Sequence, residues 1–403
     1  MAVQKPVTVS GSVRPGFEGV RQAFADNWSR HGEVGAAFCV YLQGERVVDL
    51  WGGIRDRAAG APWEEDTMVL VFSSTKGMAG LAMALLHSRG LIDYEERVAA
   101  YWPEFAQQGK ERVTVRQLLS HQAGLYALDT RVDRELVADL DRLAEVLARQ
   151  RPAREPGASQ AYHAVTLGFY EGELLRRVDP RHRSLGRFFR EEIALPLGID
   201  FHIGLPETIP NSRLAVIAQD MTDLSGMSLR NLPQIWAAIN PHSPLRRSLL
   251  GYSSPTTLVD RERVYVRGVE VPAGNGVGTA RAMARAYSAF ATGGHELSVR
   301  QETLDALMAP AVRPQRGFRD ECVLTEWELS LGFQKPNAGI PFGRPGAFGT
   351  PGWGGSFAFA DPEAKLGYAY VMNRMNAGQG SEPREEALRD ALYRVIGHPQ
   401  RAR

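Results

Sequence analysis

Short hydrophobic runs of strand-like composition lie near both ends of the chain. Residues 36–41 and 46–51 are rich in β-branched and aromatic residues and flank the four-residue segment 42–45, a pattern that predicts a β-hairpin. Residues 356–360 and 366–372 form a second such pair around a turn-like, proline-containing segment. Strands at both termini predict one antiparallel sheet that is built from the two ends of the chain.

The rest of the chain is mostly helical in pattern. Hydrophobic residues recur at three- and four-residue spacing near the N-terminus, in the middle and at the C-terminus, at 16–29, 78–89, 115–120, 136–149, 166–177, 280–291 and 385–396. Residues 206–278 lack a clear period and are richer in Pro, Asn and Ser, which is typical of a lid or pocket wall.

Together these patterns predict an α+β fold, an antiparallel sheet flanked by helices with an inserted, mostly helical domain. The predicted sheet domain comprises residues 1–75 and 280–403, and the inserted domain comprises 76–279. We expect the active site to lie between them.

Composition and charge limit the kinds of molecule that this protein is expected to bind. The chain has 403 residues, of which 44% are hydrophobic and 23% charged, and a formal net charge of +1. It contains no long run of like charges and no stretch of 18 apolar residues, so neither nucleic acid nor membrane is expected as a partner. Cys39 and Cys322 offer no disulfide framework or metal-binding spacing, and no signal-type hydrophobic segment begins the chain. A cytoplasmic protein without metal or organic cofactor is expected, whereas the oligomeric state stays open.

The sharpest chemical signal is Ser73-Ser74-Thr75-Lys76, an S-x-x-K that follows the apolar run 68–72 and begins a helix-like stretch. Residues three apart lie on one face of a helix, which brings the Ser73 hydroxyl and the Lys76 amine within reach of each other. A helix N-terminus also favours a neutral amine and offers N–H groups to an oxyanion. The alternative is a helix-capping serine followed by a solvated lysine.

Lysine usage favours the catalytic interpretation. Only five of the 47 basic residues are lysine, and no lysine except Lys76 has a serine three residues before it. Lysine can lose its proton near neutral pH and serve as a base, whereas arginine cannot.

Two further elements follow in the chain. Tyr162-His163-Ala164 precedes the predicted helix 166–177, and a tyrosine opposite a Ser/Lys pair can relay the proton. Residues 348–356 (Phe-Gly-Thr-Pro-Gly-Trp-Gly-Gly-Ser) form a glycine-rich loop, in which a backbone N–H can serve as an oxyanion donor. Each of these elements alone is weak evidence, and His163 and His121 are interpreted as structural.

These three elements, in this order, resemble the serine β-lactamase and penicillin-binding-protein superfamily, whose motifs are S-x-x-K, Y-x-N or S-x-N, and K-T-G or H-x-G. The resemblance is greatest to the class C-type relatives, the family VIII carboxylesterases. Segments similar to that family extend along some 350 residues, at 101–105, 118–125, 196–198, 275–276, 278–281 and 359–363.

Two positions depart from the β-lactamase pattern. Ala164 occupies the place of the Y-x-N asparagine, and Thr350 that of the K-T-G lysine or H-x-G histidine, if Thr350-Pro351-Gly352 is the matching triplet. The missing cation usually meets a substrate carboxylate, so its loss favours neutral esters over β-lactams. This alignment makes the Trp353 N–H the second oxyanion donor. The alternative triplet, residues 353–355, would assign that role to Ser356.

The resemblance implies a serine carboxylesterase that acts on short to medium acyl esters through an acyl-enzyme on Ser73, with Lys76 and Tyr162 as its proton-transfer residues. An acyltransferase, or weak β-lactamase or D-aminopeptidase activity, is the alternative. The Ser73 and Trp353 N–H groups are expected to bind the oxyanion. Five residues are candidates to contact the substrate, namely Tyr126, Trp236, Tyr252, Thr350 and Gly352, of which the three aromatic residues are at least as consistent with packing.

Overall fold

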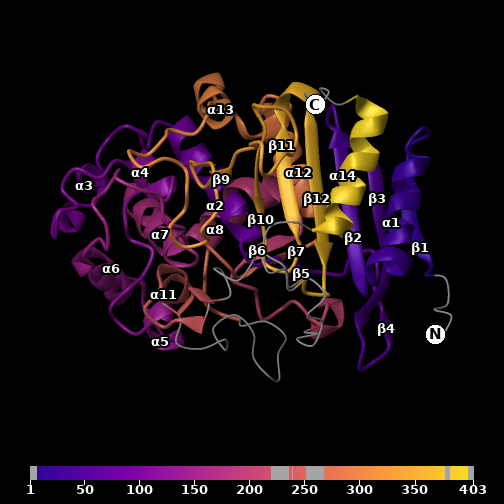
Figure 1. The fold of residues 1–403 in the computed structure, drawn as a ribbon, viewed down its shortest axis with the longest axis horizontal. Helices are drawn as coiled ribbons and strands as arrows, with labels where there is room; N and C mark the ends of the chain where they lie inside the picture. Colours follow the sequence, from indigo (N-terminus) through magenta and orange to yellow (C-terminus); the bar gives the residue numbers. More distant parts are fainter. Residues whose placement is uncertain (1–6, 219–235, 238, 251–266, 377–381, 398–403) are drawn as a thin grey trace.

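A large antiparallel sheet joins the two ends of the chain (Figure 1). The structure is a computed structural model that describes residues 7–218, 236–237, 239–250, 267–376 and 382–397. The strand order is β1-β3-β2-β12-β11-β10-β9-β8, with β4 paired to β3. The strands are β1 (Val9–Val13), β2 (Gly35–Leu42), β3 (Glu45–Asp56), β4 (Ala61–Pro62), β8 (Leu329–Ser330), β9 (Phe333–Gln334), β10 (Phe348–Pro351), β11 (Phe357–Asp361) and β12 (Leu366–Met372). The predicted α+β fold is confirmed.

Both hairpins expected from the sequence are present. β2 pairs with β3, and β11 pairs with β12, each antiparallel. The two hairpins meet where β12 pairs with β2, with Val371 opposite Ala37. The sheet therefore forms through contacts between residues more than 300 positions apart.

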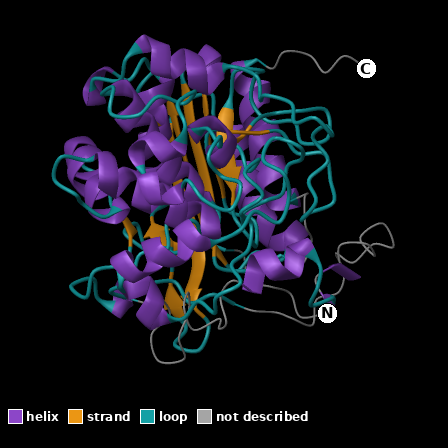
Figure 2. Ribbon diagram, turned by 90° about the vertical axis from the view of Figure 1, so that its left-hand side faces the viewer, coloured by secondary structure: helices purple, strands orange, loops and turns teal. Residues whose placement is uncertain are grey.

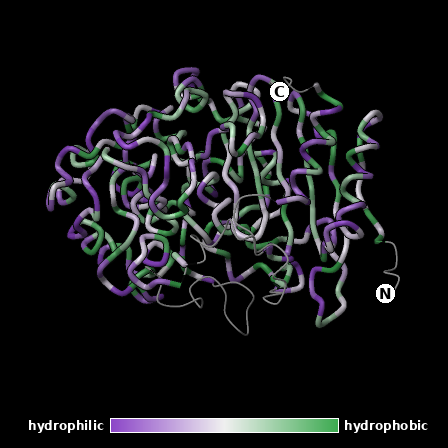
Figure 3. Tube along the Cα trace, viewed as in Figure 1, coloured by the Kyte–Doolittle hydropathy of each residue, from purple (hydrophilic) through white to green (hydrophobic). Residues whose placement is uncertain are grey.

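Helices cover both faces of this sheet (Figure 2). α1 (Glu18–His31) and α14 (Pro383–Ile396) pack together on one face, and α12 (Ala280–Ala291) packs on β2, β11 and β12 on the other. Because successive side chains of a strand point to opposite faces, β12 contributes to two hydrophobic cores. Its Tyr368 and Tyr370 join the α1/α14 core, whereas Ala369 and Val371 join the core that extends into the helical region. Figure 3 shows the hydrophobic positions along these strands.

The helical region begins with α2 (Ser74–Ser88), which is buried along its whole length. The remaining described helices and short helical turns of the chain are α3 (Val98–Tyr101), η1 (Pro103–Phe105), α4 (Val115–Leu119), α5 (Arg134–Ala138), α6 (Leu140–Arg149), α7 (Thr166–Val178), α8 (Leu185–Phe189), η2 (Arg190–Ala194), α9 (Leu195–Leu197), η3 (Asn211–Arg213), α11 (Pro244–Leu250), η7 (His295–Leu297), α13 (Gln301–Met308) and, between strands β11 and β12 of the large sheet, η8 (Pro362–Ala364). A small second sheet has the order β5-β7-β6, formed by β5 (Val69–Leu70), β7 (Gly276–Gly278) and β6 (Phe201–Ile203).

One predicted helix was wrong as a single element. The stretch 136–149 is divided between α5 and α6, because the side chain of Asp139 accepts a hydrogen bond from the Arg142 N–H and starts a second helix. The described parts of residues 206–278 include η3, α11 and β7, so this stretch is not wholly irregular. None of the described helices is long and apolar enough to cross a membrane.

Candidate active site

Ser73 lies at the start of α2, immediately after a strained residue. Phe72 has a φ of 46°, a left-handed conformation that costs a bulky residue of order 1–3 kcal/mol. The turn is held by two backbone hydrogen bonds, from the Ser74 N–H to the Val71 carbonyl at 3.1 Å and from the Thr75 N–H to the Phe72 carbonyl at 2.9 Å. The Thr75 hydroxyl also donates to the Phe72 carbonyl. Ser73 therefore occupies a fixed position at the helix N-terminus.

Lys76 is buried with its amine beside Ser73. Its Nζ lies 3.2 Å from Ser73 Oγ and donates to the Ala164 carbonyl at 2.6 Å and to the Ala273 carbonyl at 2.8 Å. Burial lowers the pKa of Lys76 to about 7, although the nearby Glu171 carboxyl opposes this shift. A substantial fraction of Lys76 is thus the neutral amine at neutral pH, the form that can accept a proton.

Tyr162 lies over the same amine. Lys76 Nζ is 4.8 Å from the centroid of the Tyr162 ring, and Trp327 and His121 pack against that ring with centroid separations of 4.8 and 4.9 Å. Burial raises the pKa of Tyr162 well above its usual value, whereas a hydrogen-bonding interaction with Ser73 opposes the rise. Tyr162 is therefore a neutral phenol at neutral pH, and Lys76 is the stronger candidate for the base.

The two histidines near Tyr162 are held by the backbone. His163 Nε2 accepts a hydrogen bond from the Leu125 N–H at 3.0 Å, and His121 Nδ1 accepts one from the His163 N–H at 2.9 Å. Burial lowers the pKa of His163 to about 3 and that of His121 well below its usual value, so both rings are neutral. Their contacts order the Tyr162 segment.

The glycine-rich loop lies against the start of α2. A Cβ added to Gly352 would come within 2.2 Å of the Val71 carbonyl oxygen and 2.8 Å of Ser74 Oγ, so this contact requires glycine. Ser356 Oγ donates to the same Val71 carbonyl at 3.0 Å and lies 3.1 Å from Ser74 Oγ. The loop and the nucleophile-bearing turn therefore form one packed unit.

Some backbone N–H groups of the described residues near this contact are free to bind an oxyanion. Within the described ranges, the N–H groups of Ser73, Trp353 and Ser356 donate no hydrogen bond. Trp353 is 61% exposed, with its ring 5.7 Å from that of Phe72, whereas Ser356 is only 2% exposed. Of the two alternative donors in the loop, the Trp353 N–H belongs to the more accessible residue.

A buried ionic network holds the far side of this loop. The carbonyl of Gly354 accepts hydrogen bonds from Arg384 Nη2 and from the Asn376 N–H, each at 3.1 Å. Arg384 also pairs with Glu33 at 3.0 Å and with Glu382 at 2.7 Å. The Gly354–Gly355 peptide, one residue beyond Trp353, is thereby fixed in orientation.

The other residues that the sequence suggested as substrate contacts lie in different environments. Thr350 is buried beside the hydroxyl of Tyr287, where both side chains face Gly77 of α2. Tyr126 is 2% exposed and belongs to the hydrophobic core, and Trp236 is 67% exposed. Tyr252 lies outside the described residues. The structure thus brings Ser73, Lys76, Tyr162, Gly352 and Trp353 together and places Thr350 next to them, whereas Tyr126 packs in the core and Trp236 is exposed.

Several residues at the site were not identified from the sequence. The carbonyls of Ala164 and Ala273 bind Lys76, but a backbone acceptor leaves no signal in side-chain identity. Glu171 had a signal, because it interrupts the apolar face formed by Leu167, Leu174 and Leu175 on α7. No cluster of three or more potential metal-ligating side chains occurs among the described residues.

The remaining described lysines have structural contacts. Lys110 Nζ donates to the carbonyls of Ala148 and Gln150 at the C-terminal end of α6, each at 2.8 Å. Lys335 Nζ donates to the Leu307 carbonyl near the end of α13 at 2.7 Å. Both lysines are buried, whereas Lys365 is exposed.

The fold and this site define a β-lactamase-like serine hydrolase. The Beta-lactamase family model matches residues 20–393. The chain therefore belongs to the Beta-lactamase family, within the β-lactamase and penicillin-binding-protein superfamily, and is a serine hydrolase of the family VIII carboxylesterase type. This assignment confirms the resemblance found in the sequence.

Three similar proteins illustrate the relationship. The Esterase/beta-lactamase LipL of Mycobacterium tuberculosis (strain ATCC 25618 / H37Rv) is 36% identical over 91% of this chain and 83% of its own. The crystal structure of a family VIII carboxylesterase is 38% identical, with a TM-score of 0.83 over 96% of this chain and 100% of its own. The structure of EstA from Arthrobacter nitroguajacolicus Rue61a is 32% identical, with a TM-score of 0.81 over 96% of this chain and 98% of its own.

Proposed function

We propose that this protein hydrolyses short to medium acyl esters through a covalent acyl-enzyme on Ser73. The observation that carries the proposal is the 3.2 Å contact between Ser73 Oγ and Lys76 Nζ, because the amine is buried and its pKa is lowered to about 7. A neutral amine at hydrogen-bond distance from a hydroxyl is the arrangement that general-base activation of a serine requires.

In the proposed acylation step, Lys76 takes the Ser73 proton while Oγ attacks the ester carbonyl carbon. The oxyanion that forms accepts hydrogen bonds from the N–H groups of Ser73 and Trp353, which donate to no other group among the described residues. The alcohol then leaves with a proton that Lys76 returns through the Tyr162 hydroxyl. Water attacks the acyl-enzyme by the same path in reverse and releases the acid.

Two features of the site support neutral esters over β-lactams. In the alignment that equates Thr350-Pro351-Gly352 with the K-T-G triplet, Thr350 replaces the cation that would meet a substrate carboxylate, and its side chain is buried next to Tyr287. Ala164 has no side-chain amide, and its carbonyl is occupied by Lys76. A carboxylate bound here would lose its water without gaining a cationic partner.

The decisive test is hydrolysis of p-nitrophenyl butyrate by the wild type and by Ser73→Ala, alongside Ser74→Ala as the neighbouring-serine control. We expect Ser73→Ala to lose more than about 99% of kcat/KM and to resist labelling by a fluorophosphonate, while Ser74→Ala is still labelled. Retention of more than a few per cent activity in Ser73→Ala would show that Ser73 is not the nucleophile.

A substrate panel separates the remaining alternatives. p-Nitrophenyl esters of increasing acyl length, nitrocefin, and an ester with an added alcohol acceptor report on esterase, β-lactamase and acyltransferase activity, respectively. We expect ester hydrolysis to exceed nitrocefin hydrolysis in kcat/KM, and the free acid to be the main product in the presence of the acceptor. The opposite order of rates, or a predominant transfer product, would reject the proposed reaction.

A further inference from the structure

A buried carboxyl group without a partner lies behind the Ser73 and Lys76 pair. Glu171, on α7, is fully buried, and neither of its carboxyl oxygens has a hydrogen-bond partner among the described residues. Among the described residues, Asp320 and Asp361 are likewise fully buried, but both are hydrogen-bonded. Asp320 accepts from the N–H groups of Cys322 and Val323, and Asp361 accepts from the Tyr393 hydroxyl. An unpaired carboxyl in this setting is costly and needs an explanation.

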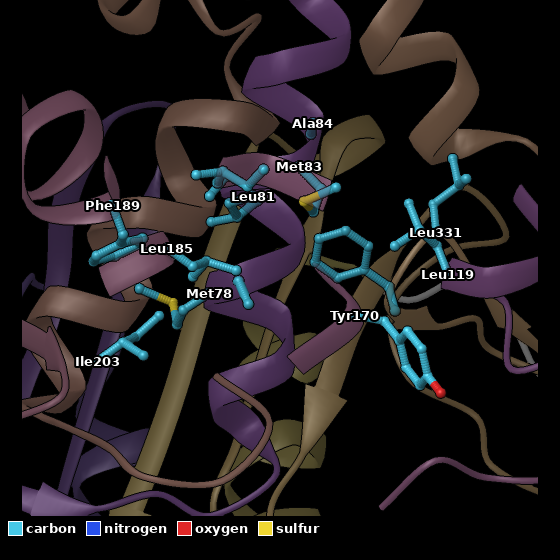
Figure 4. Close-up of a cluster of buried hydrophobic side chains, with 14 of the residues drawn as sticks. Met78, Leu81, Met83, Ala84, Leu119, Tyr170, Leu185, Phe189, Ile203 and Leu331 are labelled. Atoms are coloured by element: carbon cyan, nitrogen blue, oxygen red, sulfur yellow. The ribbon is translucent and has the colours of Figure 1, made fainter. Parts of the chain in front are cut away.

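The Glu171 carboxyl faces the turn of α2 that begins at Lys76. A Cβ built on Gly332 would lie 3.4 Å from Glu171 Oε1, 3.4 Å from Gly80 Cα and 4.0 Å from the Lys76 carbonyl oxygen. The absence of side chains at Gly80 and Gly332 leaves room for the carboxyl group against the helix. In Figure 4, Tyr170 and Leu331, the chain neighbours of Glu171 and Gly332, lie on the same flank of α2.

Lys76 and Glu171 are both buried, and few competing charges act on either group. The ionisable groups that act on Lys76 from other elements are Tyr162, His121 and His163, all of which are neutral at neutral pH for the reasons given above. Glu171 is the acid that interacts with Lys76, and Lys76 is the cation that interacts with Glu171.

The nearest acid on the same helix has a different role. Glu173 pairs with Arg176 at 2.9 Å and with Arg177 at 2.6 Å. Its charge is therefore already neutralised, and it provides a matched control for substitutions of Glu171.

We propose that Glu171 is a positioning residue for the base: its carboxyl and Lys76 form a buried acid–base pair, coupled through the interior rather than by a hydrogen bond, whose protonation decides whether Lys76 can accept the proton of Ser73. The pair has two forms without net charge. In one, a carboxylic acid faces a neutral amine; in the other, a carboxylate faces an ammonium group. They differ by the transfer of one proton from a Glu171 oxygen to Lys76 Nζ, and only the first contains a free base. Burial raises the pKa of Glu171 to about 8 and lowers that of Lys76 to about 7, so the two forms are close in free energy and both are accessible near neutral pH.

This inference rests on the proposed function only in that Lys76 is taken as the base. Its test reads the proton on Lys76 directly, by NMR titration of ¹³Cε-labelled lysine. The chain has five lysines, so the Lys76 signal can be assigned by its disappearance in Lys76→Met. The titration is recorded for the wild type, Glu171→Gln and the matched control Glu173→Gln.

We expect the Lys76 titration midpoint in Glu171→Gln to move to lower pH by roughly one unit. That is the size expected for two unit charges within about 10 Å at an effective dielectric constant near 20. Removal of the carboxylate removes the interaction that favours ammonium, so the free amine persists at lower pH. The rising limb of kcat/KM should move by the same amount, and Glu173→Gln should move neither quantity. Unchanged midpoints in Glu171→Gln would overturn the proposal.

A second variant controls for a folding defect in Glu171→Gln. Glu171→Met has a similar length and no ionisable group, and it should move the Lys76 midpoint in the same direction. If both variants fold and titrate as the wild type does, Glu171 is only a packing residue. Should Ser73→Ala retain activity, the proposed function fails, whereas the NMR midpoints still decide whether the Glu171 and Lys76 pair exists.

Discussion

The amine of Lys76 lies on the face of the Tyr162 ring, 4.8 Å from its centroid. The negative face of an aromatic ring attracts a cation, so this contact stabilises the ammonium group that forms when Ser73 gives up its proton. Burial acts in the opposite direction and favours the neutral amine. The balance keeps both protonation states of Lys76 accessible, as a catalytic base requires.

The hydroxyl of Tyr162 can be tested apart from its ring. Tyr162→Phe retains the packing against Trp327 and His121 but removes the group that interacts with Ser73. We expect kcat/KM for p-nitrophenyl butyrate to fall by about 10²–10³-fold and the free energy of unfolding to change by less than about 1.5 kcal/mol. Tyr126→Phe, at a buried tyrosine of the core, should leave kcat/KM unchanged. Nearly full activity in Tyr162→Phe would remove Tyr162 from the mechanism.

The lowered pKa of Lys76 sets the pH dependence of acylation. Because the neutral amine is the active form, kcat/KM should rise with pH through an apparent pKa of about 7 and fall about tenfold per unit well below it. Arginine stays protonated at all these pH values, so Lys76→Arg should lose about 10²–10⁴-fold in kcat/KM without recovery at pH 9. Rates measured from pH 5 to 9 check both expectations. A profile that is flat across pH 7 contradicts the assignment of Lys76 as the base.

The raised pKa of Glu171 also predicts that the stability of the folded protein depends on pH. Its pKa is raised from 4.5 to about 8 in the folded state, so the folded protein holds this proton more tightly than the unfolded chain does. The group's stabilising contribution is complete below pH 4.5 and is lost as the pH rises toward 8. Glu171→Met should therefore gain free energy of unfolding relative to the wild type between pH 5 and pH 8, by about 1–4 kcal/mol. Urea denaturation at both pH values measures this difference, and a difference independent of pH would contradict it.

The network behind the glycine-rich loop predicts a joint loss of stability and activity. Arg384→Met leaves Glu33 buried without its cation and removes one of the two hydrogen bonds to the Gly354 carbonyl. We expect a loss of about 3–5 kcal/mol in unfolding free energy and a lower kcat for the folded enzyme, because the glycine-rich loop that carries the Trp353 N–H loses part of its support. Arg389→Met is the control, since Arg389 pairs with Glu385 within α14 at 3.0 Å. If both variants kept the wild-type kcat below their melting temperatures, the network would serve stability alone.

Local pattern was sufficient to predict the strands and helices that are long or strongly periodic. The hairpins β2/β3 and β11/β12 and the helix α12 appear where alternation and helical spacing place them. The strands β8, β9 and β5 have two residues each, which is too short to produce a period. The split between α5 and α6 depends on one capping carboxylate, a local competition that periodicity does not register.

The candidate site was predictable where side-chain identity carries the chemistry. Ser73, Lys76 and Tyr162 are brought together as the order of motifs implied, because each has a distinctive side chain. Their backbone partners, and the approach of α7 to α2 that places Glu171 behind Lys76, depend on tertiary packing. For Tyr126 the residue type did not distinguish the two roles, because a large aromatic side chain fits a core as well as a pocket.

The burial of Lys76, Lys110 and Lys335 has a practical consequence for attaching this protein to other materials. Lys365 is the one exposed lysine among the described residues, and it follows β11 at the end opposite the glycine-rich loop. Among the described lysines, succinimidyl dyes or amine-reactive resins would therefore couple at Lys365 and spare the reactive amine beside Ser73. Immobilisation through Lys365 would leave the Ser73 side of the sheet turned away from the support.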